Sequence, residues 1–206
     1  MKTSCETTMA TSEQIKALRE ATGAGVLDCK KALDQHQGDF NKALAWLNEK
    51  GLAAAAKKSS RETREGVIEA YAHPGGRLAV VVEVNCETDF VARTPEFKDL
   101  AHDLALQIAS MSPKYIRRED VPADLVASKM EAHKQEALAE GKKPEIADRI
   151  AAGKIEKLYQ DICLMEQTFV KDDKVKIRDL ITAAIAKIGE NIVVRRFARY
   201  ELGEEI

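Results

Sequence analysis

Histidine and cysteine side chains supply many of the nucleophiles, general bases and metal ligands of proteins, and in this chain they are spread far apart. The sequence has 4 histidines and 4 cysteines among 206 residues. No two of them stand at the spacing of a metal site, and no CxxC pair suggests a disulfide framework. A nucleophilic Cys86 with His102 as its base is conceivable, but a cysteine that ends an apolar strand is usually packed away. The residues concerned are His36, His73, His102 and His133, and Cys5, Cys29, Cys86 and Cys163.

The signatures of nucleotide chemistry and of nucleic-acid binding are weak as well. The sequence has no GxxxxGK[ST] loop, the motif that cradles phosphates in many nucleotide-binding proteins. Its basic pairs carry no interleaved aromatic residues of the kind on which bases stack. We therefore expect no catalytic residues, no metal, no cofactor and no direct nucleic-acid partner. The sequence favours a protein that acts by binding and is not an enzyme.

Residues 86–93, Cys-Glu-Thr-Asp-Phe-Val-Ala-Arg, bring together side chains that rarely share a turn. The apolar run before them predicts a strand over 78–85, and an amphipathic helix is expected to begin near Pro95. The segment is therefore a short polar turn that places the ring of Phe90 beside the carboxylate of Asp89. Because apolar rings are normally withdrawn from such turns, Phe90 either packs back into the core or is held out for a partner. The motifs described below favour the second interpretation.

The N-terminal part of the chain predicts three short helices over residues 11–52. Thr11 and Gln14 have the spacing of a capping box, and Asp39 is a good N-cap for the third helix. Gly23 and Gly25 are expected to form a tight turn, and Gly51 is expected to end the third helix. A bundle of this size is at the lower limit of independent stability.

The residues around this module are predicted to be less ordered. Residues 53–65 contain an Ala-Lys-Ser stretch that we interpret as a solvated linker. Residues 1–10 are interpreted as a disordered tail without the apolar core of a secretion signal. Met1 and Met9 are both possible start sites. The lack of paired cysteines fits a reducing cytoplasm.

Residues 66–206 are predicted to form an α+β core domain. Strands over 67–72 and 78–85 form a hairpin, and a strand over 191–202 completes a three-stranded antiparallel sheet. Helices lie between these strands, including a helical hairpin over 124–168. The whole chain is therefore expected to be α+β, with a small helical module ahead of a larger layered domain.

Composition excludes two further classes of partner. The 32 basic and 34 acidic residues give a net charge of -2, which provides no global attraction to nucleic acid or to a membrane surface. No apolar run approaches the roughly 20 residues that span a bilayer. We expect no membrane association.

Four segments of the chain together resemble the elongation factor Ts family, namely residues 18–33, 83–92, 167–172 and 189–197. The likeness runs in order from about residue 11 to residue 204, and the first two segments are the most specific. The resemblance implies that the N-terminal helices form a ubiquitin-associated-like domain and that the larger domain docks on elongation factor Tu.

Members of this family are cytoplasmic guanine nucleotide exchange factors that bind elongation factor Tu in its GDP-bound and nucleotide-free states and exchange GDP for GTP. The resemblance implies the same role here and assigns residues to it. The segment that inserts beside the partner's nucleotide site and dislodges Mg²⁺ is matched by Thr88, Asp89, Phe90 and Val91. The segment of the N-terminal module that meets the partner is matched by Leu18, Arg19, Thr22, Gly23, Ala24, Gly25 and Val26.

Longer members of the family carry a second core subdomain, and this chain has residues for only one, so it resembles the short form. Pairing of two chains through the sheet and its flanking helices is a natural substitute, and we expect a homodimer. A cross-link through Cys163 is conceivable, although a lone cysteine on a helix is more often packed. The alternative function is a non-catalytic adaptor whose ubiquitin-associated-like module binds other ligands, but an adaptor gives no role to the turn at 88–91.

Overall fold

The computed structural model describes residues 10–204, which form a mixture of helices and strands in the α+β class, as the sequence predicted. The chain divides into two compact units. The first unit takes in the described residues up to Gly66, together with Asn85–Arg93 and Asp179–Val193. The second takes in Val67–Val84, Thr94–Arg178 and the described residues from Val194 onwards. Met1, Met9, Cys5 and most of the predicted tail lie outside the described residues.

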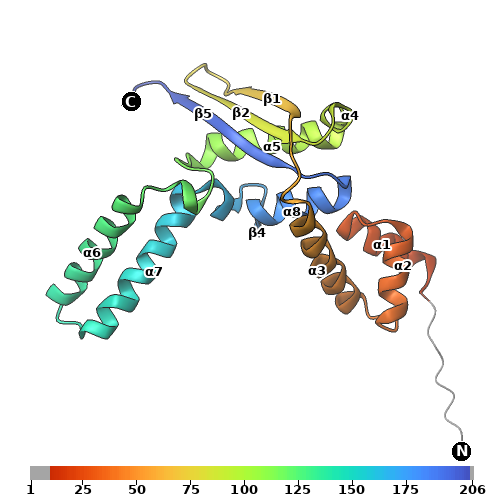
Figure 1. The fold of residues 1–206 in the computed structure, drawn as a ribbon, viewed down its shortest axis with the longest axis horizontal. Coiled ribbons are helices and arrows are strands. Elements are labelled where there is room, and N and C mark those ends of the chain that lie inside the picture. The colour runs from red at the N-terminus through yellow and green to blue at the C-terminus, as the bar shows by residue number, and fades with distance from the viewer. Residues whose placement is uncertain (1–9, 205–206) are drawn as a thin grey trace, which may run out of the picture. The chain divides into compact units, whose positions relative to one another are not determined.

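Three helices form the N-terminal module of the first unit: α1 (Ser12–Thr22), α2 (Val26–Gln35) and α3 (Phe40–Lys58) (Figure 1). The predicted capping box is present, because Thr11 accepts a hydrogen bond from the backbone of Gln14 and the Gln14 side chain accepts one from the backbone of Thr11. Asp39 caps α3 through the backbone N–H of Lys42 at 3.0 Å. The core of the module is formed by Leu18, Cys29, Ala32, Leu33, Ala43 and Leu47, and Ala10 packs against it.

The prediction that α3 ends at Gly51 is wrong, because the helix continues to Lys58. The next residues, Leu-Ala-Ala-Ala-Ala at 52–56, are strong helix formers that continue the helix, and Gly51 itself lies close to α8 (Ile177–Ile188). A Cβ placed on Gly51 would lie 3.3 Å from the Cβ of Ala186, which is closer than nearly all real contacts of this kind. Gly51 is therefore a point of close helix approach and does not act as a helix stop. Residues 53–58 of the linker that we predicted are helical in the structure.

The sheet consists of β1 (Glu65–Ala72), β2 (Leu78–Cys86) and β5 (Val193–Glu201) in the antiparallel order β1-β2-β5. Helix α5 (Pro95–Met111) runs along one face of it (Figure 1). Every second residue of β2 from Val80 to Val84 is buried, which is the alternation expected of a sheet with one covered face. The helix begins at a Thr94 cap with Pro95 in its first turn, and it ends at Ser112 in a left-handed conformation with φ 47°.

The helical hairpin of the second unit consists of α6 (Ala123–Ala139) and α7 (Pro144–Ile162) (Figure 1). Ion pairs between the two helices join Lys134 to Asp148 at 2.7 Å and Lys154 to Glu136 at 2.6 Å. We expected α7 to continue to about residue 167. It stops at Ile162, whose carbonyl accepts hydrogen bonds from the backbone N–H groups of Lys114 and Tyr115; Cys163 is extended, and a 3-10 helix, η2 (Leu164–Glu166), follows.

A second, two-stranded sheet that the sequence did not predict follows the hairpin. Its strands are β3 (Thr168–Phe169) and β4 (Asp172–Lys176), which pair in antiparallel fashion. Both strands are short, and β4 begins with charged residues, so neither carries the apolar alternation that reveals a strand.

Among residues 10–204, no helix combines the length and the hydrophobicity that crossing a bilayer requires.

Candidate functional site

The turn between β2 and α5 contains a single turn of helix, α4 (Asp89–Ala92). Thr88 is its N-cap, with an extended backbone at φ −127°, and its side-chain oxygen accepts a hydrogen bond from the backbone N–H of Val91 at 3.4 Å. Asp89 stands in the first turn, where a carboxylate interacts favourably with the unpaired N–H groups of a helix. The polar residues that made this segment look like a loop therefore initiate a short helix.

Because the turn is helical, neighbouring side chains of α4 lie in different environments. The ring of Phe90 is 77% exposed, whereas Val91 and Ala92 are buried. The carboxylate of Asp89 is exposed and forms an ion pair with Arg93 at 2.8 Å. The structure thus holds Phe90 out of the core, as the sequence analysis favoured, and places Val91 inside the protein as part of the turn's support.

Two acidic side chains that the sequence analysis did not single out anchor this turn. Glu190 accepts hydrogen bonds from the backbone N–H groups of Glu87 and Thr88 and from the Thr88 hydroxyl. Glu87 in turn accepts one from the backbone N–H of Asn191 at 2.7 Å. Residues 87 and 190 are separated by more than a hundred positions, and no sequence pattern relates them. The sequence signal was only that Glu190 lies in one of the segments that carry the family resemblance.

Cys86 is buried at the base of the turn, and its thiol donates a hydrogen bond to the carbonyl of Thr88 at 3.1 Å. Burial, reinforced by the nearby carboxylate of Glu190, raises the pKa of the Cys86 thiol to about 11. The thiolate is the nucleophilic form, so a thiol with this pKa is unreactive at neutral pH. His102 has a different partner, the carboxylate of Glu69, at 2.8 Å. Cys86 is a structural residue, as the sequence analysis expected.

The predicted partner-binding segment of the N-terminal module has an exposed part and a buried part. Arg19, Gly25 and Val26 are exposed, whereas Leu18 is fully buried in the module's core and supports the segment from inside. Thr22 closes the end of α1, since its hydroxyl donates to the Leu18 carbonyl at 2.6 Å and accepts from the backbone N–H of Ala24 at 3.2 Å.

The loop from Thr22 to Gly25 is constrained on its other side as well. Gly23 has φ 67°, a conformation that residues with a Cβ rarely adopt, and a Cβ there would lie 3.0 Å from the Lys187 side chain of α8. Beyond the loop, Leu27 is 83% exposed at the start of α2, beside the half-exposed Val26. The sequence analysis missed Leu27, although an apolar residue one position from a predicted contact was available as a signal.

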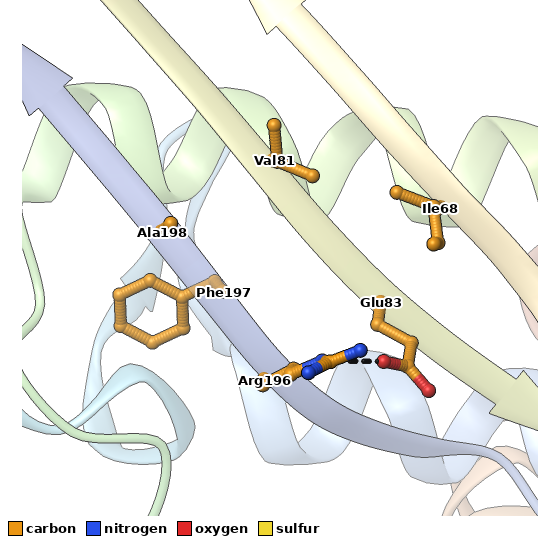
Figure 2. A pocket seen from close by; sticks show the side chains of 6 residues that line it. All are labelled: Ile68, Val81, Glu83, Arg196, Phe197 and Ala198. Atoms are coloured by element: carbon orange, nitrogen blue, oxygen red, sulfur yellow. Dashed lines mark hydrogen bonds and ion pairs between the residues drawn. The ribbon is translucent and has the colours of Figure 1, made fainter.

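The uncovered face of the three-stranded sheet is a third candidate surface, and it lies in the second unit. The side chains of Ile68, Val81, Phe197 and Ala198 line a hollow of about 260 Å³, and Figure 2 shows how they lie on the three strands. Ile68 is 67% exposed and Val81 is 41% exposed. Glu83 lies at the edge of this hollow, where it bonds to the guanidinium of Arg196 at 2.7 Å.

Within residues 10–204, no group of three or more His, Cys, Asp or Glu side chains could hold a metal ion.

Comparison with known proteins gives this geometry its context. The sequence matches the protein family described as "Elongation factor TS" over residues 6–204. The chain belongs to the elongation factor Ts family. It is 57% identical over 191 residues to elongation factor Ts of Herpetosiphon aurantiacus, a match that covers 93% of this chain and 96% of the relative. It is 55% identical over 196 residues to that of Heliobacterium modesticaldum, covering 95% and 91% of the two chains.

A further relative, elongation factor Ts of Carboxydothermus hydrogenoformans, is 53% identical over 196 residues, covering 95% of this chain and 90% of that one. Membership of the elongation factor Ts family makes the chain a translation elongation factor with a role in protein biosynthesis. The segments that suggested the family from sequence alone include the turn at Thr88–Val91 and the block that contains Glu190.

Proposed function

We propose that this chain binds elongation factor Tu and promotes the exchange of GDP for GTP by displacing Mg²⁺ and opening the nucleotide site. The observation that carries the proposal is the ring of Phe90, which is 77% exposed on an anchored helical turn beside Asp89. Aromatic side chains are enriched at the cores of protein interfaces, so an exposed Phe on a hydrogen-bonded turn is well suited to contact a partner. Membership of the family supports this partner, and we propose the cytoplasm as the location of the exchange.

The proposed mechanism requires no chemistry from the chain itself. A G protein holds GDP through backbone amides of its phosphate loop and a bound Mg²⁺ ion. An exchange factor weakens this hold by binding the nucleotide-free state more tightly than the GDP-bound state. Burying a Phe ring contributes about 1.5–3 kcal/mol, so insertion of Phe90 only in the nucleotide-free complex would shift the equilibrium roughly ten- to a hundredfold. The chain is accordingly proposed to act without a catalytic residue, metal or cofactor of its own.

We assign different parts of this task to Thr88, Asp89, Phe90 and Val91. The exposed side chains of Phe90 and Asp89 are proposed to contact the partner, the ring as a wedge and the carboxylate at the groups that hold Mg²⁺. Thr88 and Val91 are proposed to keep the turn in shape, since Thr88 is bonded to Glu190 and Val91 is buried.

The N-terminal module supplies a second proposed contact. Its three helices are proposed to form a ubiquitin-associated-like domain that meets the partner through Arg19, Gly23–Val26 and the neighbouring Leu27. The last two residues of this set are apolar and exposed at 51% for Val26 and 83% for Leu27, which supports a binding role. Leu18 and Thr22 are proposed to hold this loop in place.

We further propose that two copies of the chain pair through the uncovered sheet face around Ile68, Val81 and Phe197. Both strands that flank β2 are edge strands, and the hollow between them is lined by Ile68, Val81, Phe197 and Ala198 together with Glu83, which pairs with Arg195 and Arg196 (Figure 2). An open apolar face of this kind is typical of an interface between protein chains.

The proposed function is tested by measuring the release of a fluorescent GDP derivative from elongation factor Tu in a stopped-flow instrument. Addition of the chain should accelerate release in a concentration-dependent manner that saturates. Release at the intrinsic rate would contradict the proposal, and it would leave the adaptor alternative, in which the module binds other ligands, as the better explanation.

A further inference from the structure

We infer that Glu190 is a positioning residue for nucleotide exchange, whose carboxylate fixes the turn that presents Phe90 to the partner. The inference rests on the proposed function and extends it to a residue that does not itself reach the partner's nucleotide. Glu190 lies in the loop between α8 and β5, within the same compact unit as the turn.

Both oxygens of the Glu190 carboxylate are used at the start of α4. Oε2 accepts hydrogen bonds from the backbone N–H groups of Glu87 at 3.1 Å and Thr88 at 3.0 Å. Oε1 accepts one from the Thr88 hydroxyl at 2.7 Å. Because the only hydroxyl hydrogen of Thr88 points at Glu190, its lone pairs remain free to accept from the N–H of Val91. One carboxylate therefore satisfies two backbone donors directly and orients the cap of α4.

A reciprocal set of bonds ties Glu190 and the turn to the segment that follows α3. Glu87 Oε1 accepts from the backbone N–H of Asn191 at 2.7 Å and lies 3.4 Å from the guanidinium of Arg61. The side-chain amide of Asn191 donates to the carbonyl of Arg61 at 2.8 Å and to that of Ser59 at 3.4 Å. The adjacent residues Glu190 and Asn191 thus connect the turn to the end of the N-terminal module.

The exposure of Phe90 makes this support necessary. An exposed ring is not held by core packing, so its position is set by the backbone on which it stands. A helix of a single turn has almost no stability of its own, because nucleation is costly and its first N–H groups lack intrahelical partners. The buried side chains of Val91 and Ala92 fix the inner side of the turn. Glu190 supplies the polar half of the support, and it does so with charge-assisted bonds, which are the stronger kind.

The experiment compares Glu190→Ala, Glu190→Gln and the control Glu49→Ala in the full-length chain. The control removes the same charge from an exposed position on α3 of the same unit. A Gln amide oxygen can accept both backbone bonds, and its NH₂ group can donate to the Thr88 hydroxyl, so this variant should retain the turn. Release of fluorescent GDP from elongation factor Tu is measured over a range of chain concentrations, which separates the maximal rate from the half-saturating concentration.

We expect Glu190→Ala to lower the maximal release rate by at least about tenfold, as misplacement of a contact group by an ångström can do. Glu190→Gln should stay within about threefold of the original chain, and Glu49→Ala should match it. If Glu190 acts through the ring, the double variant with Glu190→Ala and Phe90→Ala should have a maximal release rate less than about threefold below that of Phe90→Ala alone, because the two changes are coupled. A full and independent loss in the double variant would overturn the inference.

Hydrogen–deuterium exchange of the isolated chain provides a readout that does not depend on the partner. In Glu190→Ala the amides of Glu87, Thr88 and Val91 should exchange faster while the core of the N-terminal module keeps its protection. Unchanged protection at these amides would refute the positioning role even if exchange activity were lost. If instead the original chain does not accelerate GDP release, the proposed function fails, and the protection of these amides still decides whether Glu190 holds the turn.

Discussion

At the scale of single residues, Phe90 and Val91 show how adjacent apolar side chains can serve different purposes. The ring of Phe90 is 77% exposed, and the side chain of Val91 is buried. Truncating the ring removes little buried area, so it should change stability by less than about 0.5 kcal/mol. Truncating the valine leaves a cavity in a packed region and is expected to destabilise the protein.

We predict that Phe90→Ala slows nucleotide exchange by at least about tenfold while leaving the melting temperature nearly unchanged. Val91→Ala, the matched control, should lower the melting temperature instead. Stopped-flow release of fluorescent GDP and a thermal melt of each variant separate the two effects. If Phe90→Ala melts early but exchanges normally per folded molecule, the ring belongs to the core and its assignment as a wedge is incorrect.

Glu166 gives a second prediction at the residue scale, because three basic side chains surround it. Its side chain is 7% exposed and bonds to Arg118 at 2.8 Å and to Arg178 at 3.5 Å, with Lys176 at 3.9 Å. The bond from Arg118 is the main cause that lowers the pKa of Glu166 below its ordinary value. A carboxyl whose pKa is lower in the folded than in the unfolded protein stabilises the fold. This stabilisation is fully present above the pKa of the unfolded state, about 4.3, and it is lost as the pH falls through the pKa of the folded state.

We therefore expect Glu166→Gln to lower the free energy of unfolding at pH 7 by about 1–3 kcal/mol, with the difference shrinking as the pH falls through the lowered pKa of Glu166 in the folded state. Glu156→Gln is the control, since Glu156 bonds to the same Arg118 at 2.8 Å but is 55% exposed. Exposed ion pairs contribute about 0–1 kcal/mol, so the control should change little. Urea unfolding at several pH values measures both variants, and a loss for Glu166→Gln that is independent of pH would contradict the account.

At the scale of helices and strands, two glycines inside helices allow the effect of local helix propensity on stability to be distinguished from the effect of tertiary packing. Gly51 lies within α3, where an added Cβ would come 3.3 Å from Ala186, and Gly153 lies within α7, where nothing is found within 4 Å. Replacing a glycine by alanine inside a helix is worth roughly 0.5–1 kcal/mol when the new methyl group has room.

Gly153→Ala should accordingly raise the free energy of unfolding by about 0.5–1 kcal/mol, whereas Gly51→Ala should give little or none of this gain because α3 and α8 must move apart. Chemical denaturation of the two variants makes the comparison. If Gly51→Ala and Gly153→Ala stabilise the protein equally, α3 and α8 can accommodate an added methyl group, and their close approach does not explain why residue 51 is a glycine.

The same elements show which parts of the fold a sequence can reveal. Local signals gave the capping box at Thr11, the N-cap at Asp39 and the apolar face of β2, because capping and alternation are decided within a few residues. The end of α7 at Ile162 depends on a segment distant in the chain, and at Gly51 the helix formers that follow outweighed the glycine that we read as a stop. The exposure of Phe90 was anticipated only after the family resemblance was considered.

The candidate site likewise contains residues that could be predicted from the sequence and residues that could not. The residues that project from it, Phe90 and Asp89, could be predicted because they form a continuous motif. The residues that support it were predicted only in part: Thr88, Val91 and Leu18 were named as site residues, but Glu190, which reaches Thr88 across about a hundred positions of sequence, was not. Long-range hydrogen bonds leave no periodic trace in a single sequence.

At the scale of the whole molecule, the uncovered sheet face predicts self-association. We expect the chain to sediment at micromolar concentration with twice the 22.8 kDa mass of one chain. Ile68→Lys should shift it towards the monomer, because a charge would then lie in an apolar interface. Val170→Lys, at another exposed apolar position, should not. Sedimentation equilibrium measures all three, and a monomeric original chain would rule out the proposed pairing.

Cys163 contributes nothing to this association in the folded state. It is fully buried, its thiol lies 3.6 Å from the Arg117 carbonyl, and burial raises its pKa to about 11. A buried thiol that remains protonated does not form a disulfide with a second chain unless the fold opens. A cross-link through Cys163 is therefore not expected, and Cys163→Ser should leave the sedimentation of the chain unchanged.

The proposed exchange requires the chain to bind nucleotide-free elongation factor Tu more tightly than the GDP-bound form. Thermodynamic linkage makes this coupling reciprocal, so GDP with Mg²⁺ must weaken the chain's affinity by the same factor by which the chain weakens the affinity for GDP. Isothermal titration calorimetry of the chain into elongation factor Tu, with and without saturating GDP and Mg²⁺, measures this factor directly. We expect the nucleotide-free protein to bind the chain at least about a hundredfold more tightly. Equal affinity in the two conditions would leave no thermodynamic route to exchange and would contradict the proposal.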